Sequence, residues 1–202
     1  MRNDFKRCRA REDARPLRFD ALKTIVAQTR RDTILLATTG YTGRELYTID
    51  DSVLNLYLVG SMGCVGSLGL GLALSRKDKD VVVIDGDGSL LMRMGALAVI
   101  ARQNPENLLH IILDNQCYES TGGQTTMSGS IDFVELVSAV GFRRVLYLHD
   151  LVDLEECLCS WKKEKGLTFA YLKIAVGTQP GLARPTVSPR EVKERFRKAL
   201  HE

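Results

Sequence analysis

The 202-residue sequence predicts an α/β domain with a doubly wound, mostly parallel β-sheet and helices on both faces. Three observations indicate this fold. Short apolar runs such as 81–84 (VVVI), typical of strands buried on both faces, alternate with helical stretches. Two of these runs end in glycine-rich turns. Hydrophobic residues make up 45% of the chain, and this length suits one sizeable domain with one core.

Each element follows from a local pattern. Strands are expected where β-branched or apolar runs are bounded by turn residues, at 33–38, 54–59, 81–84, 108–113, 143–148 and 168–174. Helices are expected at 19–29, 64–75, 90–102, 132–140, 151–165 and 189–200, with a helical turn at 44–49. Ser89 is expected to cap the helix 90–102, and Gly141 is expected to end the helix 132–140. The stretch 116–130, rich in Gly, Ser and Thr, is expected to be a loop.

An acidic turn and an amide follow two successive strands. Gly86, Asp87, Gly88 and Ser89 come after one strand, and Asn115 comes after the next. The glycines permit φ > 0 and a close approach of the backbone to a ligand, and a helix N-terminus attracts anions. Mg²⁺ prefers oxygen ligands that it shares with substrate phosphates. Asp87 and Asn115 are therefore expected to bind a magnesium diphosphate.

The segment GDGSLLMRMGALAVIARQNPENLLHIILDN resembles the thiamine diphosphate motif, in which GDG is followed one helix and one strand later by N. The resemblance implies that Asp87 and Asn115 bind Mg²⁺ and that the backbone carbonyl of Cys117 is a third ligand. It also implies thiamine diphosphate as the cofactor, bound with the help of Gly86, Gly88 and Ser89.

A second glycine-rich segment agrees with the first. Gly60, Ser61, Met62 and Gly63 close a strand, and glycines continue every third residue into the next helix, which leaves a bare stripe for close packing or for a cofactor. In thiamine enzymes a large apolar residue at the position of Met62 supports the bent cofactor. The alternative is that Met62 is ordinary core filler.

Three further stretches, ATTGYTGREL (37–46), ESTGGQ (119–124) and GLARPT (181–186), resemble phosphonopyruvate decarboxylase in its C-terminal, cofactor-binding half. The resemblance runs from about residue 19 to the C-terminus, and the sulfopyruvate decarboxylase β subunit is similar as well. The TGRE stretch favours the phosphonate enzyme. The implied reaction is the non-oxidative decarboxylation of 3-phosphonopyruvate to phosphonoacetaldehyde and CO₂, in which the cofactor accepts the electrons.

The resemblance also implies a partner. In this family the activating glutamate belongs to a pyrimidine-binding domain, and this chain is too short to contain one. We therefore expect a partner domain or α subunit to supply it. The chain alone is expected to bind little cofactor and to decarboxylate nothing.

Residues that contact the substrate are harder to predict. Arg44, which follows a glycine turn, is a candidate to bind the substrate anion, and Arg184 is a weaker one. The alternative for Arg44 is a surface arginine that pairs with Glu45 or another neighbour. Thr121 and Gln124 are candidate catalytic donors on a loop that closes over the thiazolium ring, unless that loop is a solvated turn.

The chain ends, the net charge and the cysteines limit which other classes of protein fit this sequence. Residues 1–18 carry seven Arg or Lys against three acids, a composition that we interpret as a basic tail or linker preceding a cofactor domain at 19–202. A net charge of +3 gives little support for nucleic-acid binding. No membrane span is visible. The five cysteines show no disulfide or metal pattern, which indicates a cytoplasmic protein and disfavours an iron–sulfur oxidoreductase.

Two other functions stay open. A cofactor-binding but inactive subunit that regulates a catalytic partner is consistent with the same motifs. An NAD-binding protein is disfavoured because no G-x-G-x-x-G opens a helix.

Overall fold

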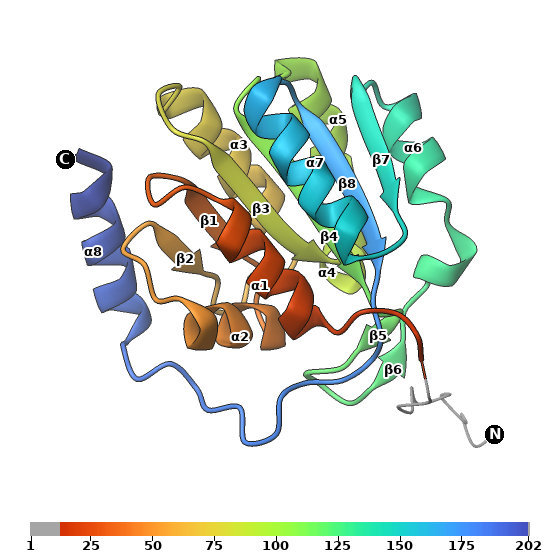
Figure 1. Cartoon of the computed structure of the whole chain (residues 1–202), viewed down its shortest axis with the longest axis horizontal. Coiled ribbons are helices and arrows are strands. Elements are labelled where there is room, and N and C mark those ends of the chain that lie inside the picture. The colour runs from red at the N-terminus through yellow and green to blue at the C-terminus, as the bar shows by residue number, and fades with distance from the viewer. Residues whose placement is uncertain (1–12, 202) are drawn as a thin grey trace.

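A computed structural model describes residues 13–201. At its centre lies a six-stranded sheet of order β2-β1-β3-β4-β8-β7, in which every pair of neighbours is parallel (Figure 1). The strands are β1 (Ile34–Ala37), β2 (Asn55–Tyr57), β3 (Val81–Gly86), β4 (Leu108–Asp114), β7 (Arg144–Leu148) and β8 (Thr168–Lys173). A short antiparallel hairpin of β5 (Cys117–Tyr118) and β6 (Gln124–Thr125) stands apart. The expected α/β fold is confirmed.

Helices cover both faces of the sheet (Figure 1). They are α1 (Arg18–Gln28), α2 (Tyr41–Ile49), α3 (Val65–Ser75), α4 (Asp87–Met92), α5 (Gly95–Gln103), α6 (Phe133–Ala139), α7 (Leu151–Lys163) and α8 (Pro189–His201). One apolar core joins α1, α2 and α7 to the sheet, and another joins α3, α5 and α6 to the opposite face. Along β3, Val82 and Ile84 belong to the first core while Val81 and Val83 belong to the second, because successive side chains alternate across a strand.

The strand order places a topological switch point between β1 and β3. The chain goes from β1 to β2 on one side and then to β3 on the other, so the connections after β1 and β3 leave in opposite directions. In open parallel sheets the crevice outside the carboxyl ends of such strands is the usual ligand site. Both glycine-rich turns and the loop after β4 lie at this end of the sheet.

The glycine stripe on α3 serves close packing against the sheet. A Cβ on Gly69 would collide with the side chain of Val83, and one on Gly66 would lie 3.1 Å from Cε1 of His110. The first glycines of α3 therefore bring the helix down onto β3 and β4. Gly71, further along, faces open space.

The expected single helix 90–102 is wrong. The chain forms α4 and α5 instead, separated by Arg93, whose φ of −143° and ψ of 44° are not helical. Ser89 does not cap a helix, because it lies inside α4 and Gly86 is the N-cap. The Ser89 hydroxyl instead accepts hydrogen bonds from the N–H of Gly63 at 3.0 Å and from the hydroxyl of Thr38 at 2.9 Å.

The domain boundary expected after residue 18 stays a prediction, although residues 17 and 18 already belong to the folded part of the chain. Leu17 forms an isolated parallel bridge with Ala175, and Arg18 begins α1 with its side chain buried. Arg18 is inside because two carboxylates compensate its charge. Residues 1–12, which hold most of the expected tail, lie outside the described part of the chain.

The remaining differences are local. The stretch 116–130 contains the β5–β6 hairpin and a 3₁₀ turn at Ser128–Ser130, in place of a featureless loop. Gly141 ends α6 with φ of 103°, as expected. Among the described residues, no helix combines the length and apolar character that crossing a bilayer requires.

Candidate cofactor site

A cavity opens at the switch point, outside the carboxyl ends of β1, β3 and β4. Eight of the residues predicted from the sequence line it, namely Met62, Gly86, Asp87, Gly88, Ser89, Asn115, Cys117 and Thr121. They converge because the carboxyl ends of neighbouring parallel strands meet at one edge of the sheet. Arg18 and Glu119, which sequence reasoning did not assign to the site, line the same cavity.

Asp87 is a buried carboxylate without an ion-pair partner among the described residues. It is 2% exposed, and its Oδ2 accepts a hydrogen bond from the hydroxyl of Thr126. Burial and the nearby charge of Asp114 raise the pKa of Asp87 to about 7. Asp114 has its own donors, the N–H of Gln116 at 2.7 Å and the hydroxyl of Ser128 at 3.0 Å. A divalent cation at Asp87 would compensate the negative charge of the buried Asp87 carboxylate. The donor set therefore fits Mg²⁺.

Asn115 follows β4 and faces two partners. Its Oδ1 accepts the N–H of Cys117 at 3.0 Å, and its Nδ2 donates to Oε2 of Glu119 at 3.0 Å. Gln116, between Asn115 and Cys117, has φ of 58° and turns the chain sharply. Asn115 and Cys117 line the same cavity as Asp87, so the amide oxygen and the Cys117 carbonyl are candidate hard oxygen donors for a cation there. No group of three or more His, Cys, Asp or Glu in residues 13–201 is placed to hold a metal ion, so a cation here needs this mixed set.

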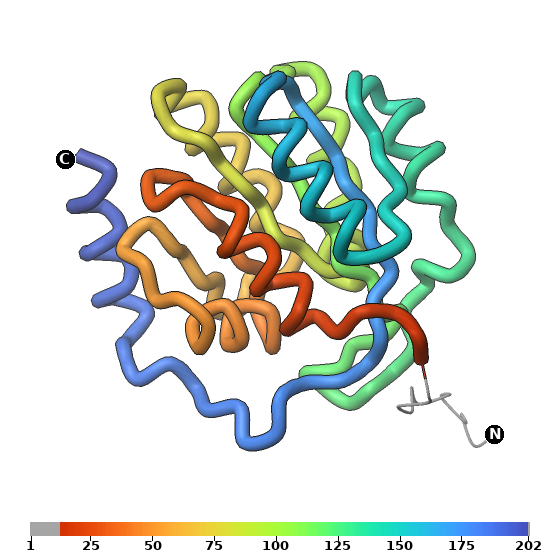
Figure 2. The backbone as a smooth tube through the Cα atoms, in the orientation of Figure 1, coloured from red at the N-terminus to blue at the C-terminus, as the bar shows by residue number. Residues whose placement is uncertain are grey.

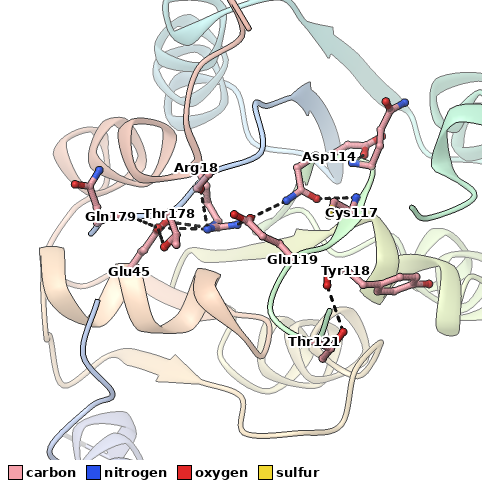
Figure 3. A network of polar contacts seen from close by, with 12 residues as sticks. Arg18, Glu45, Asp114, Cys117, Tyr118, Glu119, Thr121, Thr178 and Gln179 are labelled. Carbon is pink, nitrogen blue, oxygen red and sulfur yellow. Dashed lines mark hydrogen bonds and ion pairs between the residues drawn. The ribbon is translucent and has the colours of Figure 1, made fainter. Parts of the chain in front are cut away.

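Glu119 is held by a buried ion network (Figure 3). Arg18 donates from Nη1 to Oε2 of Glu119 at 2.9 Å and from Nε to Oε2 of Glu45 at 2.9 Å. Its Nη2 also donates to the carbonyl of Gly177 at 3.2 Å. Burial by itself lowers the pKa of Arg18, but the charges of Glu45 and Glu119 outweigh burial and raise it. The network connects the Asn115 amide to α1, α2 and the segment after β8.

Sequence reasoning missed this network because nothing local connects its members. Arg18 and Glu119 are 101 positions apart, and Arg18 and Glu45 are 27 apart. The available signals were weak. Glu45 follows Arg44 directly, which suggested a pairing between these two as one alternative, whereas the structure pairs Glu45 with Arg18.

Met62 lies in a strained turn at the cavity. Gly60, Ser61 and Gly63 have φ of 74°, 52° and 84°. Met62 is half-buried, lines the cavity and belongs to neither apolar core, so the core-filler alternative is wrong. Gly60, Ser61 and Gly63 do not line the cavity themselves. They shape the turn, in which the Gly60 N–H donates to the hydroxyl of Thr39 at 3.1 Å.

The glycines of the acidic turn act differently from the expectation. Neither Gly86 nor Gly88 has positive φ. A Cβ on Gly88 would collide with the ring of Tyr118, so this glycine lets the β5–β6 hairpin pack against α4. The close approach that the glycine permits is therefore to another part of the chain.

The predicted catalytic residue Gln124 and the predicted substrate-binding residue Arg44 also lie outside this cavity. Gln124 is exposed in β6, whereas Thr121 lines the cavity and donates to the carbonyl of Tyr118 at 3.3 Å (Figure 3). Arg44 lines a neighbouring cavity together with Arg184.

The fold and this cavity define an α/β domain with a ligand site at the switch point of a parallel sheet. The chain belongs to the thiamine pyrophosphate enzyme family, because residues 39–202 match its C-terminal TPP binding domain. The structure of a putative thiamin diphosphate-dependent enzyme from Mycobacterium smegmatis has the same fold, with a TM-score of 0.70 at 17% identity over 81% of this chain and 32% of that one.

Two curated relatives are more similar in sequence. The chain is 44% identical to phosphonopyruvate decarboxylase from Streptomyces viridochromogenes over 93% of its own length and 47% of the relative. It is 39% identical to sulfopyruvate decarboxylase subunit beta from Methanothermobacter thermautotrophicus over 91% of its own length and 95% of that chain. The chain thus spans about half of the first relative and nearly all of the second.

Proposed function

We propose that this chain is the diphosphate- and Mg²⁺-binding half of a thiamine diphosphate-dependent 2-oxoacid decarboxylase. The reaction that we propose for the complete enzyme is the conversion of 3-phosphonopyruvate to phosphonoacetaldehyde and CO₂. The observation that carries the proposal is the convergence of Asp87, Asn115, Cys117 and Met62 on one cavity at the switch point. The family match and the 44% identity to a phosphonopyruvate decarboxylase support it.

Each residue has a distinct role in this proposal. Asp87, the Asn115 amide oxygen and the Cys117 carbonyl would hold Mg²⁺, which would supply positive charge for a diphosphate. Met62 supports the bent cofactor, and Thr121 lies close enough to the cavity to contact its ligand. Bound thiamine diphosphate supplies the electron sink for loss of CO₂, while the protein binds and orients the reacting groups. Gln124 stays a candidate only if the β5–β6 hairpin moves toward the cavity.

The proposal includes a partner that carries the pyrimidine-binding domain and the activating glutamate. The chain covers only 47% of the phosphonopyruvate decarboxylase but 95% of a protein named a β subunit, and both observations suit a half-size chain. We propose the cytoplasm as its location, in agreement with the free thiols of Cys64, Cys157 and Cys159.

Reconstitution with a pyrimidine-domain chain tests this function. Calorimetry is expected to detect uptake of thiamine diphosphate with Mg²⁺, and CO₂ release is expected with phosphonopyruvate. Asp87→Asn is expected to abolish both, because it removes the carboxylate ligand. Asp78→Asn, at an exposed ion pair with Arg76, is the matched control. Turnover by the 202-residue chain alone, or no cofactor uptake by the pair, would contradict the proposal.

Sulfopyruvate is the second candidate substrate, favoured by the nearly complete match to a sulfopyruvate decarboxylase β subunit. A faster reaction with sulfopyruvate in the same assay would select it. Cofactor uptake without turnover of either oxoacid would instead indicate a regulatory subunit.

A further inference from the structure

A second cavity adjoins the cofactor site. It lies between α2, β2 and the segment after β8, which runs beneath the molecule to reach α8 (Figure 2). Thr39 and Ser120 line both cavities. Val59 lines the second cavity and Met62, three residues further along, lines the first. A ligand in the second cavity would therefore reach toward the cofactor position.

Two arginines give this cavity a single sign of charge. Arg44 and Arg184 line it, and no Asp or Glu does. Neither arginine forms an ion pair with a described residue, and Glu45, which is next to Arg44 in sequence, is bound by Arg18. Fields from like charges in a cleft with low-dielectric walls concentrate ions of the opposite sign. The cavity thus attracts an anion.

The Arg44 guanidinium is already oriented. It donates from Nε to the carbonyl of Ala183 at 3.2 Å and from Nη2 to the carbonyl of Leu182, and it stacks on the ring of Tyr41 at 5.3 Å. Carbonyls do not neutralise its charge, and its Nη1 donates to no described group. A guanidinium fixed in this way loses little side-chain entropy on binding an anion.

The size of the cavity suits a small ligand. Its volume of about 450 Å³ is within the range of small-molecule sites. A hydrogen bond of 2.9 Å between the hydroxyls of Tyr47 and Thr186 helps to hold the segment after β8 against α2. Arg184 is exposed and lies on that segment, so the cavity depends on how the segment is placed.

We propose that this second cavity is the anion subsite of the reaction, in which Arg44 and Arg184 bind the tetrahedral anionic group of the 2-oxoacid. Its occupant is a phosphonate or a sulfonate. Two cations suit the phosphonate better because it carries up to two negative charges. The identity of the substrate rests on the proposed function, whereas binding of the anion does not.

Binding to the full chain, without cofactor or partner, tests the subsite. Methylphosphonate, methanesulfonate and acetate are titrated while the Arg Nε–H signals are followed by NMR. The wild type is expected to bind methylphosphonate more tightly than acetate. Arg184→Gln is expected to weaken methylphosphonate about tenfold, because a charge-assisted hydrogen bond is lost. Arg190→Gln, an exposed arginine on α8 outside the cavity, is the matched control and is expected to bind as the wild type does.

Arg44→Lys and Arg44→Gln complete the series. Lysine keeps the charge but loses the planar fork, so it is expected to bind with an affinity between those of the wild type and Arg44→Gln. Arg184 is exposed and its substitution is expected to leave the fold intact, so Arg184→Gln remains decisive if the Arg44 variants do not fold. Equal binding by wild type and Arg184→Gln, or no preference for methylphosphonate over acetate, overturns the proposal.

Kinetics of the reconstituted enzyme give a second readout. Arg184→Gln is expected to raise KM for the phosphonate or sulfonate substrate about tenfold and to leave KM for pyruvate unchanged. An equal effect on both substrates overturns the proposal. If the pair takes up no thiamine diphosphate but the chain still binds methylphosphonate through Arg184, the anion site stands and the proposed reaction fails.

Discussion

The carboxylate of Glu119 lies 3.0 Å from the side-chain nitrogen of Asn115. A carboxylate accepts hydrogen bonds and cannot donate them when ionised, so it selects the Nδ2 side of the amide. The amide oxygen is then available as a ligand. Arg18 holds Glu119 in turn through the 2.9 Å ion pair. Partners of this kind orient metal ligands and commonly affect metal affinity.

Removal of the Glu119 carboxylate is expected to weaken metal binding. Glu119→Ala leaves the Asn115 amide held, among the described residues, only by the N–H of Cys117, so Mn²⁺ affinity of the reconstituted complex, measured by EPR with thiamine diphosphate present, should fall about 10- to 100-fold. Glu119→Gln keeps an acceptor and should lose less. Glu156→Ala, on the exposed side of α7, is the control. Wild-type affinity in Glu119→Ala would show that the amide is held by other contacts.

Loss of Arg18 is expected to destabilise the fold itself. Arg18→Gln leaves Glu45, which is fully buried, without its cation, and breaking a buried pair costs about 3–5 kcal/mol in free energy of unfolding. Urea denaturation measures this loss. Adding Glu45→Gln should recover part of it, because the uncompensated charge is removed. Arg76→Gln, in the exposed pair with Asp78, should leave stability nearly unchanged. Equal midpoints for Arg18→Gln and Arg76→Gln would contradict the burial argument.

Gly88 and Gly71 are expected to respond oppositely to alanine. At Gly88 a Cβ meets the Tyr118 ring, so Gly88→Ala should destabilise the chain by about 1–3 kcal/mol. At Gly71, inside α3, a Cβ meets nothing within 4 Å, so Gly71→Ala should stabilise by about 0.5–1 kcal/mol through helix propensity. Thermal unfolding compares the two variants. A Gly88→Ala variant as stable as the wild type would mean that Tyr118 moves aside freely.

Cys157 is expected to be unreactive in the folded chain. Burial raises the pKa of its thiol to about 11, with the charge of Arg144 opposing the shift. Because the pKa of this thiol in the folded chain lies above its ordinary value of 9.0, the thiol contributes stability that is complete below about pH 9 and is lost as pH rises toward 11. Iodoacetamide at pH 9 should modify Cys157 only in urea, as mass spectrometry can show. Alkylation at equal rates in the native state would rule out the burial effect.

Prediction from sequence succeeded where one local pattern determines one position. The run 81–84 indicated a strand buried on both faces, and the following GDG placed Asp87 at its carboxyl end. Asn115 follows β4 in the same manner, so parallel pairing of β3 with β4 brings both residues to one edge of the sheet. Their convergence on one cavity needed only the rule that parallel strands end together.

The tertiary structure decided what depends on distant partners. Helix periodicity gave no reason to break 90–102, but Ser89 bonds to Gly63 and Thr38 and the chain leaves helical geometry at Arg93. The sequence assigned Arg18 to a polar tail, whereas in the structure its side chain is hydrogen-bonded to Glu45 and Glu119.

The sequence by itself therefore determined where the strands lie along the chain and which polar residues follow them, because these follow from periodicity and backbone conformation. Only the tertiary structure decided which charges are buried together, which arginines remain without a carboxylate, and where the second cavity lies. Electrostatic pairing and cavity shape depend on distances between segments far apart in the chain, and no local pattern records those distances.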